Sequence, residues 1–443
     1  MKRAIALTLF SALLCSCSTD SPTLPDDDGL GEADTPVEPP PWDFPTEELP
    51  PEVLGNITGT VFSPAESVQY RLPISKALVY LDRMEPGALP QGNYCDKCVN
   101  LDTGNPYDIT DSFGTFRIDN IPEGDWNLVV QKGQFRRVRR ITVYGGQTLE
   151  IPNDITTLPS HPDAGLMDSI PKIAVASGSY DWFEDLLAKF GLADLAADFH
   201  YVRGTEEFTL FFNGGRAWSP GTYEDFKVML RRPLGTDDAD DLSDFNILFI
   251  PCTGEDADEV LAEEEVKANL RTFVAEGGKL YVSDYSYDFV EQIFPAFVEF
   301  VGNDAAIGSA ETTMTDFWDA TGSIRDADLS AWLTGMSIAP NEVELLMSWV
   351  GVEGTSIVPG EDEEHNPVDI TPLEVILGDT PGYGSKPLNV TFNYGCGKVL
   401  FTTYHTIGAL VGAPRPEMIT QEKILLYLVL DIAVCSDTVI IPI

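Results

Sequence analysis

The stretch that most constrains the fold is 245–294, which reads as two strands alternating with two helices. FNILFIPC (245–252) and KLYVSD (279–284) are short apolar runs, typical of strands that are buried on both faces. Between them, apolar residues recur at helical spacing over 266–274, and a Gly-Gly pair then stops the helix. Parallel strands joined by a helical crossover predict an open α/β sheet, whose ligand crevice lies past the carboxyl ends of its strands.

The first residues have the features of an export signal. Lys2 and Arg3 precede an apolar run at 4–14 that is too short to span a bilayer as a folded helix. The sequence Leu-Cys-Ser-Cys that ends at Cys17 then resembles a bacterial lipobox. We predict that 1–17 is a lipoprotein signal peptide and that acyl chains on Cys17 anchor the protein in a membrane, with an ordinary secretory cleavage site as the alternative. The expected location is the bacterial cell envelope, at the outer membrane or the cell surface.

Composition narrows the possible partners. Residues 18–52 are rich in proline and acidic residues, so they cannot bury enough apolar surface to fold alone and are predicted to be a disordered tether. The whole chain has a formal net charge of -44, which makes nucleic acid an improbable partner because both molecules are strongly negative.

Cysteine pairing is expected in an exported protein. Cys95 and Cys98 form a CxxC motif without a second ligand pair, which favours a local disulfide over a zinc site. Cys396 precedes the last expected strand and Cys435 follows the last expected helix, so a Cys396–Cys435 disulfide is predicted and Cys252 is left as the odd thiol. No metal and no other cofactor is expected.

Residues 53–152 are predicted to form an all-β sandwich, because short β-rich runs alternate there with turn signals. This region contains four motifs, at Gly59-Thr60-Val61, Pro73 to Val79, Thr110 to Phe116 and Ile121 to Trp126. In this order, the motifs resemble those of the carboxypeptidase regulatory-like (transthyretin-like) domain. The resemblance implies a non-catalytic sandwich used for stability, spacing or adhesion. A cluster of four arginines at 136–140 is interpreted as a solvated edge strand that is protected from aggregation.

A linker at 153–171 is expected to lead into an α/β domain at 172–436, followed by a tail at 437–443. Alternating strand and helix patterns indicate this class, with helices over 180–190, 287–294 and 420–434. The less regular segment 305–372 is expected to pack over the sheet or its mouth.

The α/β region resembles the class I glutamine amidotransferase-like domain, a flavodoxin-like open sheet. The resemblance rests on Leu248 to Pro251, on Phe273 to Leu280 and on Gly395 to His405. In that family the nucleophile follows the strand that corresponds to KLYVSD, which implies Asp284, or Ser283 one residue earlier, at this position. His405 matches the family's histidine. Because the nucleophile position holds no cysteine and no His-x-Glu follows, glutaminase activity is not expected.

Three interpretations of this position remain. It is a degenerate pocket with Asp284 and His405 as a buried pair, a hydrolase or lyase site built on Ser283, Asp284 and His405, or a binding pocket. Candidate binding residues at the strand ends are Ser177, Tyr180, Thr253, Glu255, Tyr285 and Tyr404. The sequence favours a non-enzymatic binding or scaffolding lipoprotein with a glycan or peptide ligand, and the alternative is a hydrolase that acts on a glycan or peptide.

Overall fold

The computed structural model describes residues 53–95, 104–214, 223–236, 239–253, 257–302, 306–314, 316–362, 365–406 and 416–432. The chain divides into two units, Met1–Pro50 and Pro51–Ile443, and all of the described residues belong to the second. The predicted signal peptide, Cys17, the tether, Glu255, Cys98, Cys435 and the C-terminal tail therefore lie outside the described residues. Among the helices that the structure describes, none combines the length and the apolar character that a membrane span requires.

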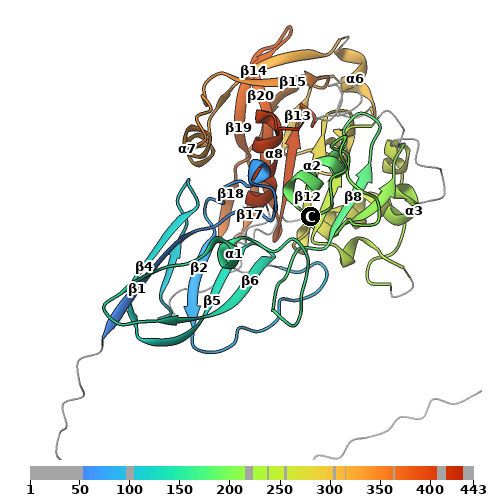
Figure 1. Ribbon diagram of the computed structural model, residues 1–443. Coiled ribbons are helices and arrows are strands. Elements are labelled where there is room, and N and C mark those ends of the chain that lie inside the picture. The colour runs from blue at the N-terminus through green and yellow to red at the C-terminus, as the bar shows by residue number, and fades with distance from the viewer. Residues whose placement is uncertain are drawn as a thin grey trace, which may run out of the picture. The chain divides into compact units, whose positions relative to one another are not determined.

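The first part of the unit is built from two β-sheets (Figure 1). One has the order β4-β1-β7, with β1 at Leu54–Thr60, β4 at Thr115–Pro122 and β7 at Thr148–Glu150. The other has the order β3-β2-β5-β6, with β3 at Tyr107–Ile109, β2 at Leu78–Asp82, β5 at Gly124–Lys132 and β6 at Phe135–Val143. Buried residues of both sheets, such as Ile57 and Val79, share one apolar cluster. This first part is therefore built from strands, as the sequence predicts.

The turn before β4 is closed by a side chain and contains a required glycine. The Asp111 carboxylate accepts hydrogen bonds from the backbone N–H groups of Phe113 and Thr115, at 2.8 and 2.9 Å. Gly114 has a φ of +75°, and a Cβ there would lie 2.6 Å from the Val61 carbonyl oxygen, so glycine is required. The turn connects two sheets and not a hairpin, because β3 and β4 belong to different sheets.

The arginine cluster lies on β6, which is an edge strand as predicted. The linker packs along the free edge of β6, so this edge is not exposed to solvent alone. Asp168 is 7 % exposed and binds Arg137 at 3.1 Å and Arg139 at 2.7 Å, while the backbone of Ser169 pairs with that of Arg136. The linker also contains a short helix, α1, at Asn153–Thr156.

The second part contains a ten-stranded sheet of order β10-β9-β8-β11-β12-β21-β20-β19-β14-β15 (Figure 1). The strands are β10 Glu224–Asp225, β9 Thr209–Phe212, β8 Ile173–Ser177, β11 Ile247–Ile250, β12 Lys279–Ser283, β21 Gly397–Thr402, β20 Gly384–Tyr394, β19 Leu373–Thr380, β14 Trp318–Ile324 and β15 Val343–Ser348. Neighbours from β10 to β21 pair in parallel, and neighbours from β21 to β15 pair in antiparallel fashion. The predicted α/β sheet is therefore extended by an antiparallel half.

Helices cover both faces of the sheet. Ile247 and Phe249 of β11 belong to the apolar cluster that contains α2 (Phe183–Phe190) and α8 (Thr420–Ile432). Leu248 and Ile250 belong to the opposite cluster, with residues of α3, α4 and α5. These three helices are α3 at Phe226–Leu230, α4 at Glu264–Ala275 and α5 at Asp288–Glu291. This confirms the expectation that the apolar run around β11 is buried on both faces.

Two segments differ from the sequence prediction. The helix expected over 287–294 is shortened to α5, which follows a turn of 3-10 helix at Asp284–Ser286. Within 305–372, β14 and β15 extend the main sheet instead of packing over it, and α7 (Ala327–Gly335) packs against β14. Met347 and Trp349, which end this β15 region, do lie at the mouth, next to His405 and Tyr285. The remaining described elements form small pieces: α6 at Ser309–Thr313, β13 at Val298–Phe300 with β16 at Val352–Thr355, and β17 at Val358–Glu361 with β18 at Pro367–Ile370.

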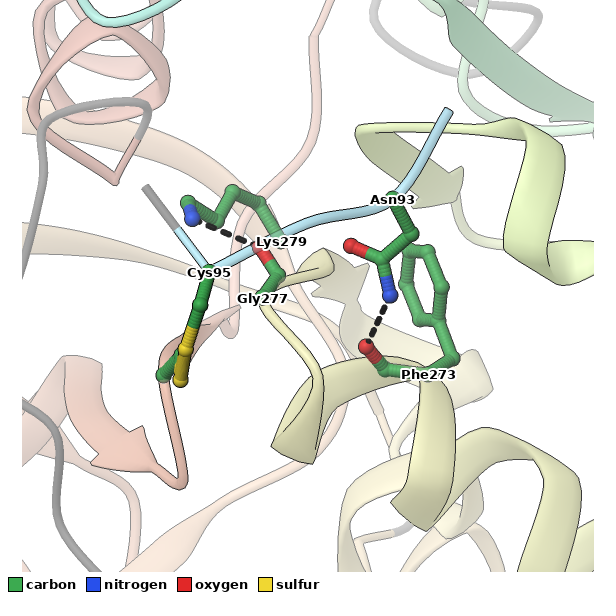
Figure 2. The surroundings of a disulfide bond; sticks show 6 residues. Asn93, Cys95, Phe273, Gly277 and Lys279 are labelled. Carbon is green, nitrogen blue, oxygen red and sulfur yellow. Dashed lines mark hydrogen bonds between the residues drawn. A yellow bond between two sulfur atoms is a disulfide. The ribbon is translucent and has the colours of Figure 1, made fainter. Parts of the chain in front are cut away.

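Both predicted disulfides are wrong, because Cys95 and Cys396 pair with each other (Figure 2). Their Cα atoms are 5.3 Å apart although the sequence separation is 301 residues. The segment before Cys95 runs from the β-sandwich to the α/β sheet, where the Asn93 amide donates to the Phe273 carbonyl oxygen at 2.7 Å. The disulfide thus links the two parts of the unit covalently.

Candidate functional site

Three neighbouring strands place side chains at one edge of the sheet. Cys252 follows β11, Asp284 follows β12 and His405 follows β21. Because β11, β12 and β21 are parallel neighbours, their carboxyl ends meet at the same edge. The structure therefore brings Asp284 and His405 together, as the sequence predicts, and adds Cys252.

The three side chains form a compact buried cluster. Nε2 of His405 lies 3.2 Å from Oδ2 of Asp284. One donor atom from each of Cys252, Asp284 and His405 can be chosen so that all three lie within 4.8 Å of one another. The residues are 1 %, 0 % and 2 % exposed, respectively. We refer to them below as the strand-end cluster.

Asp284 occupies an unusual backbone conformation. Its φ is +43°, in the left-handed region that an L-residue enters at a cost of about 1–2 kcal/mol. The turn is closed by a hydrogen bond of 2.8 Å from the Tyr287 N–H to the Asp284 carbonyl oxygen. Asp284 therefore begins a tight turn directly after β12. Strained residues of this kind concentrate at functional sites.

The Ser283 hydroxyl is engaged by a second carboxylate. It donates to Oδ2 of Asp181 at 2.9 Å and accepts the Cys252 N–H, also at 2.9 Å. Oδ1 of Asp181 accepts the Thr406 N–H at 3.0 Å. Asp181, in the loop after β8, is fully buried and hydrogen-bonded to the ends of β12 and β21, yet a single aspartate in a loop gives no sequence signal.

Burial sets the charge of the histidine. It lowers the pKa of the His405 imidazole, while the nearby Asp181 carboxylate and the Met347 backbone raise it. The neutral imidazole is consequently the favoured form at neutral pH. Met347 itself has a φ of +62°, so a second residue that contacts His405 is held in the left-handed region.

The remaining predicted binding residues have different environments. Ser177, Thr253 and Tyr404 are buried, and the Thr253 hydroxyl donates to the Asn213 carbonyl oxygen at 2.8 Å. Tyr180 and Tyr285 are partly exposed. The Tyr285 ring meets Trp349 edge-on, with centroids 5.2 Å apart, and Trp349 stacks on Phe317 at 5.6 Å. Phe317 and Trp349 were missed because they lie in the segment whose sequence pattern is least regular.

Comparisons with known proteins leave the family open. No family model matches the chain, and no curated protein matches it. A putative carbohydrate-binding protein of Pseudomonas aeruginosa is 16% identical over 24% of this chain and 89% of its own, with a TM-score of 0.17. The minor pilin GBS52 of Streptococcus agalactiae is 16% identical over 24% of this chain and 45% of its own, with a TM-score of 0.16.

A third similarity covers more of the chain. The GH42 β-galactosidase Gan42B is 14% identical over 54% of this chain and 28% of its own, with a TM-score of 0.25. This chain therefore spans less than half of the pilin and less than a third of the β-galactosidase. TM-scores in this range carry no argument about function, which has to come from the residues themselves.

Proposed function

We propose that this protein is a lipid-anchored protein of the bacterial cell envelope that binds a glycan through its α/β part without chemical turnover. The observation that carries the proposal is a row of three aromatic rings, Tyr285, Trp349 and Phe317, which begins one residue after Asp284. We call it the aromatic row. Its rings come from two segments that are distant in sequence and meet beside the strand ends.

The aromatic row has the exposure that ligand binding needs. Phe317 is 48 % exposed, and Tyr285 and Trp349 are partly exposed. The apolar C–H face of a sugar ring packs on such rings, while a tyrosine hydroxyl can give a polar contact at the rim. We therefore favour a glycan over an extended peptide, which commonly binds by adding a strand to an exposed sheet edge.

The strand-end cluster supports binding rather than turnover. Each of its residues is at most 2 % exposed, so a substrate bound on the aromatic row does not reach the cluster in this conformation. A general acid or base has to come within hydrogen-bond distance of the reacting atoms. We interpret the cluster as the base of the site, consistent with the degenerate pocket that the sequence allows.

In this proposal, the other parts of the chain have roles that suit a protein of the cell envelope. The α/β part would be an amidotransferase-like sheet with Asp284 in place of the thiol. The N-terminal β-sandwich, with its resemblance to carboxypeptidase regulatory-like domains, would space the α/β part from the membrane. The tether and the lipid on Cys17 would hold the protein there.

A glycan and peptidoglycan-fragment array tests the binding proposal. The full chain should bind at least one glycan class, and Phe317→Ala and Trp349→Ala should each weaken the binding about tenfold or more, since such aromatic anchors are typical hot spots. Tyr144→Ala is the matched control, because Tyr144 is 53 % exposed on the β-sandwich and belongs to no ring pair of the row. Equal binding by wild type and both variants would refute the proposal, and a peptide-only hit would redirect it.

A hydrolase is the second candidate, favoured by one observation. Asp284 lies on a left-handed turn after a parallel strand, and its carboxylate contacts His405 at 3.2 Å, as an acid/base pair would. Glycosidase and peptidase screens of wild type against His405→Ala separate the two functions. Activity that His405→Ala abolishes would establish the hydrolase, and identical background in both would eliminate it.

The anchor has its own test. Globomycin, which inhibits lipoprotein signal peptidase, should cause accumulation of the precursor of the wild-type chain. The Cys17→Ser variant should lack lipid and should not respond to the inhibitor. Unchanged processing in both cases would favour the ordinary secretory cleavage site.

A further inference from the structure

The strand-end cluster brings together three types of side chain that can bind a metal ion. It has a thiol from Cys252, a carboxylate from Asp284 and an imidazole from His405, contributed by the ends of three different strands. Cys252 is the one described cysteine outside the Cys95–Cys396 disulfide. Because these residues are far apart in sequence, their convergence results from the sheet order and not from a local motif.

The spacing of the donor atoms is close to that of a tetrahedral site. Zinc binds cysteine sulfur at about 2.3 Å, and histidine nitrogen and carboxylate oxygen at about 2.0–2.2 Å, which puts tetrahedral donor atoms about 3.3–3.8 Å apart. The His405–Asp284 distance is 3.2 Å, and all three donor atoms lie within 4.8 Å. Small side-chain rotations would bring the three atoms to coordination distances.

The surroundings hold the three donors in position. The Cys252 N–H is bound by the Ser283 hydroxyl, whose own proton goes to Asp181. The Gln421 side chain donates to the His405 carbonyl oxygen. Asp284 is fixed by its left-handed turn. Contacts of this kind orient the ligands of a metal ion and form the outer shell of a metal site.

From this arrangement we propose that Cys252, Asp284 and His405 bind one Zn²⁺ ion, which joins the ends of β11, β12 and β21. A soft sulfur donor with an imidazole and one carboxylate suits zinc, whereas Mg²⁺ and Ca²⁺ prefer sites made wholly of oxygen atoms. The charge also fits, since a dication offsets a buried thiolate and a buried carboxylate that are costly to bury alone. The site goes beyond the proposed glycan binding, which needs no metal.

Metal titration of the full chain, purified in detergent, tests the proposal. After chelation and dialysis, the protein should take up about one Zn²⁺ per chain, and added zinc should raise the thermal unfolding midpoint because the ion binds the folded state. Co²⁺ in place of Zn²⁺ should give a sulfur-to-cobalt charge-transfer band, which reports directly on coordination by a cysteine.

Variants assign the ligands. Cys252→Ser should remove the charge-transfer band. Cys252→Ser and His405→Gln should each weaken zinc binding at least tenfold, because changing even an outer-shell partner of a metal ligand typically costs about tenfold or more. Asp284→Asn should also weaken it while keeping the turn, since asparagine tolerates positive φ. His365→Ala is the control for surface histidines and should bind zinc like wild type, because His365 is exposed.

The result that overturns the proposal is equally direct. A folded wild-type chain that shows no charge-transfer band with Co²⁺ and no zinc-dependent shift in unfolding would refute the site. Zinc bound with equal affinity by wild type and by folded Asp284→Asn and Cys252→Ser would refute the assignment. If Cys252→Ser or His405→Gln fails to fold, the cobalt spectrum of wild type and the Asp284→Asn affinity still decide.

Discussion

The Lys189 ammonium lies 3.0 Å from the Glu422 carboxylate, and the two side chains are 1 % and 2 % exposed. The pair joins α2 to α8 on one face of the ten-stranded sheet. Burial raises the pKa of the Glu422 carboxyl, whereas Lys189 and the backbone N–H of Ile419 lower it. Each of the two buried charges is therefore stabilised by the charge of its partner.

Removing one charge of this pair should destabilise the protein strongly. Lys189→Met leaves the Glu422 carboxylate buried without its counter-ion, which typically costs about 3–5 kcal/mol of unfolding free energy. Urea unfolding followed by tryptophan fluorescence measures the loss. The double variant Lys189→Met/Glu422→Gln should recover most of it, because the Gln oxygen can still accept from Ile419. A double variant as unstable as the single one would show that packing, not charge, is responsible.

The Cys95–Cys396 disulfide should contribute to stability because it closes a long loop. Cys95→Ser/Cys396→Ser is expected to lose about 2–5 kcal/mol relative to the oxidised wild type, as for native disulfides in other proteins. Non-reducing peptide mapping should show a Cys95–Cys396 peptide in wild type, and Cys98→Ser should leave that peptide and the stability unchanged. A Cys95–Cys98 peptide in its place would contradict the structure.

The accuracy of the sequence predictions depended on whether the signal was local. Val266 and Leu270 recur at helical spacing, so α4 was predicted, and the apolar runs around β11 and β12 were predicted in the same way. These features need only a short window of sequence. The pairing of Asp284 with His405 was instead expected from the resemblance to the amidotransferase-like domain, and the parallel neighbours β12 and β21 bring the two residues together.

The missed features depend on contacts between distant segments. Cys95 reaches Cys396 because an insertion in the β-sandwich crosses to the α/β sheet, and no periodicity encodes that path. Cys252 was assigned no role because the resembled family uses a thiol after a different strand. Asp181, in the loop after β8, is hydrogen-bonded to the ends of β12 and β21, contacts that only the folded chain shows.

The left-handed backbone at Asp284 should reverse the usual stability order of alanine and glycine variants. Alanine is normally at least as stable as glycine in ordered structure, but at a φ of +43° a Cβ is strained and glycine is not. Asp284→Gly should therefore be more stable than Asp284→Ala by about 1 kcal/mol, measured by urea unfolding. Both variants lack the carboxylate, so their difference isolates the backbone. The usual order, with alanine the more stable, would show that the turn relaxes.

Lys132 should make stability depend on pH above neutrality. Its side chain is buried, and burial lowers the pKa of the ammonium from 10.5 to about 8. Asp431 and Asp328 partly offset this by raising the pKa, while Lys76 and Lys398 lower it further. Between pH 8 and pH 10.5 the unfolded chain keeps a proton that the folded chain has lost, so the unfolding free energy rises as pH increases through this window.

The expected gain at Lys132 is about 2 kcal/mol between about pH 8 and pH 10, since a full pKa unit corresponds to about 1.4 kcal/mol. Urea unfolding at a series of pH values measures it, with Lys132→Met as the reference because methionine has a similar length and no titrating proton. Other alkaline effects are common to both chains, so the difference between the two curves reports on Lys132 alone. Lys132→Met should be the more stable protein below pH 8, and the curves should converge as the pH approaches 10.5. Parallel curves would mean that the ammonium has the same pKa in the folded and the unfolded chain, and that it reaches solvent in the folded state.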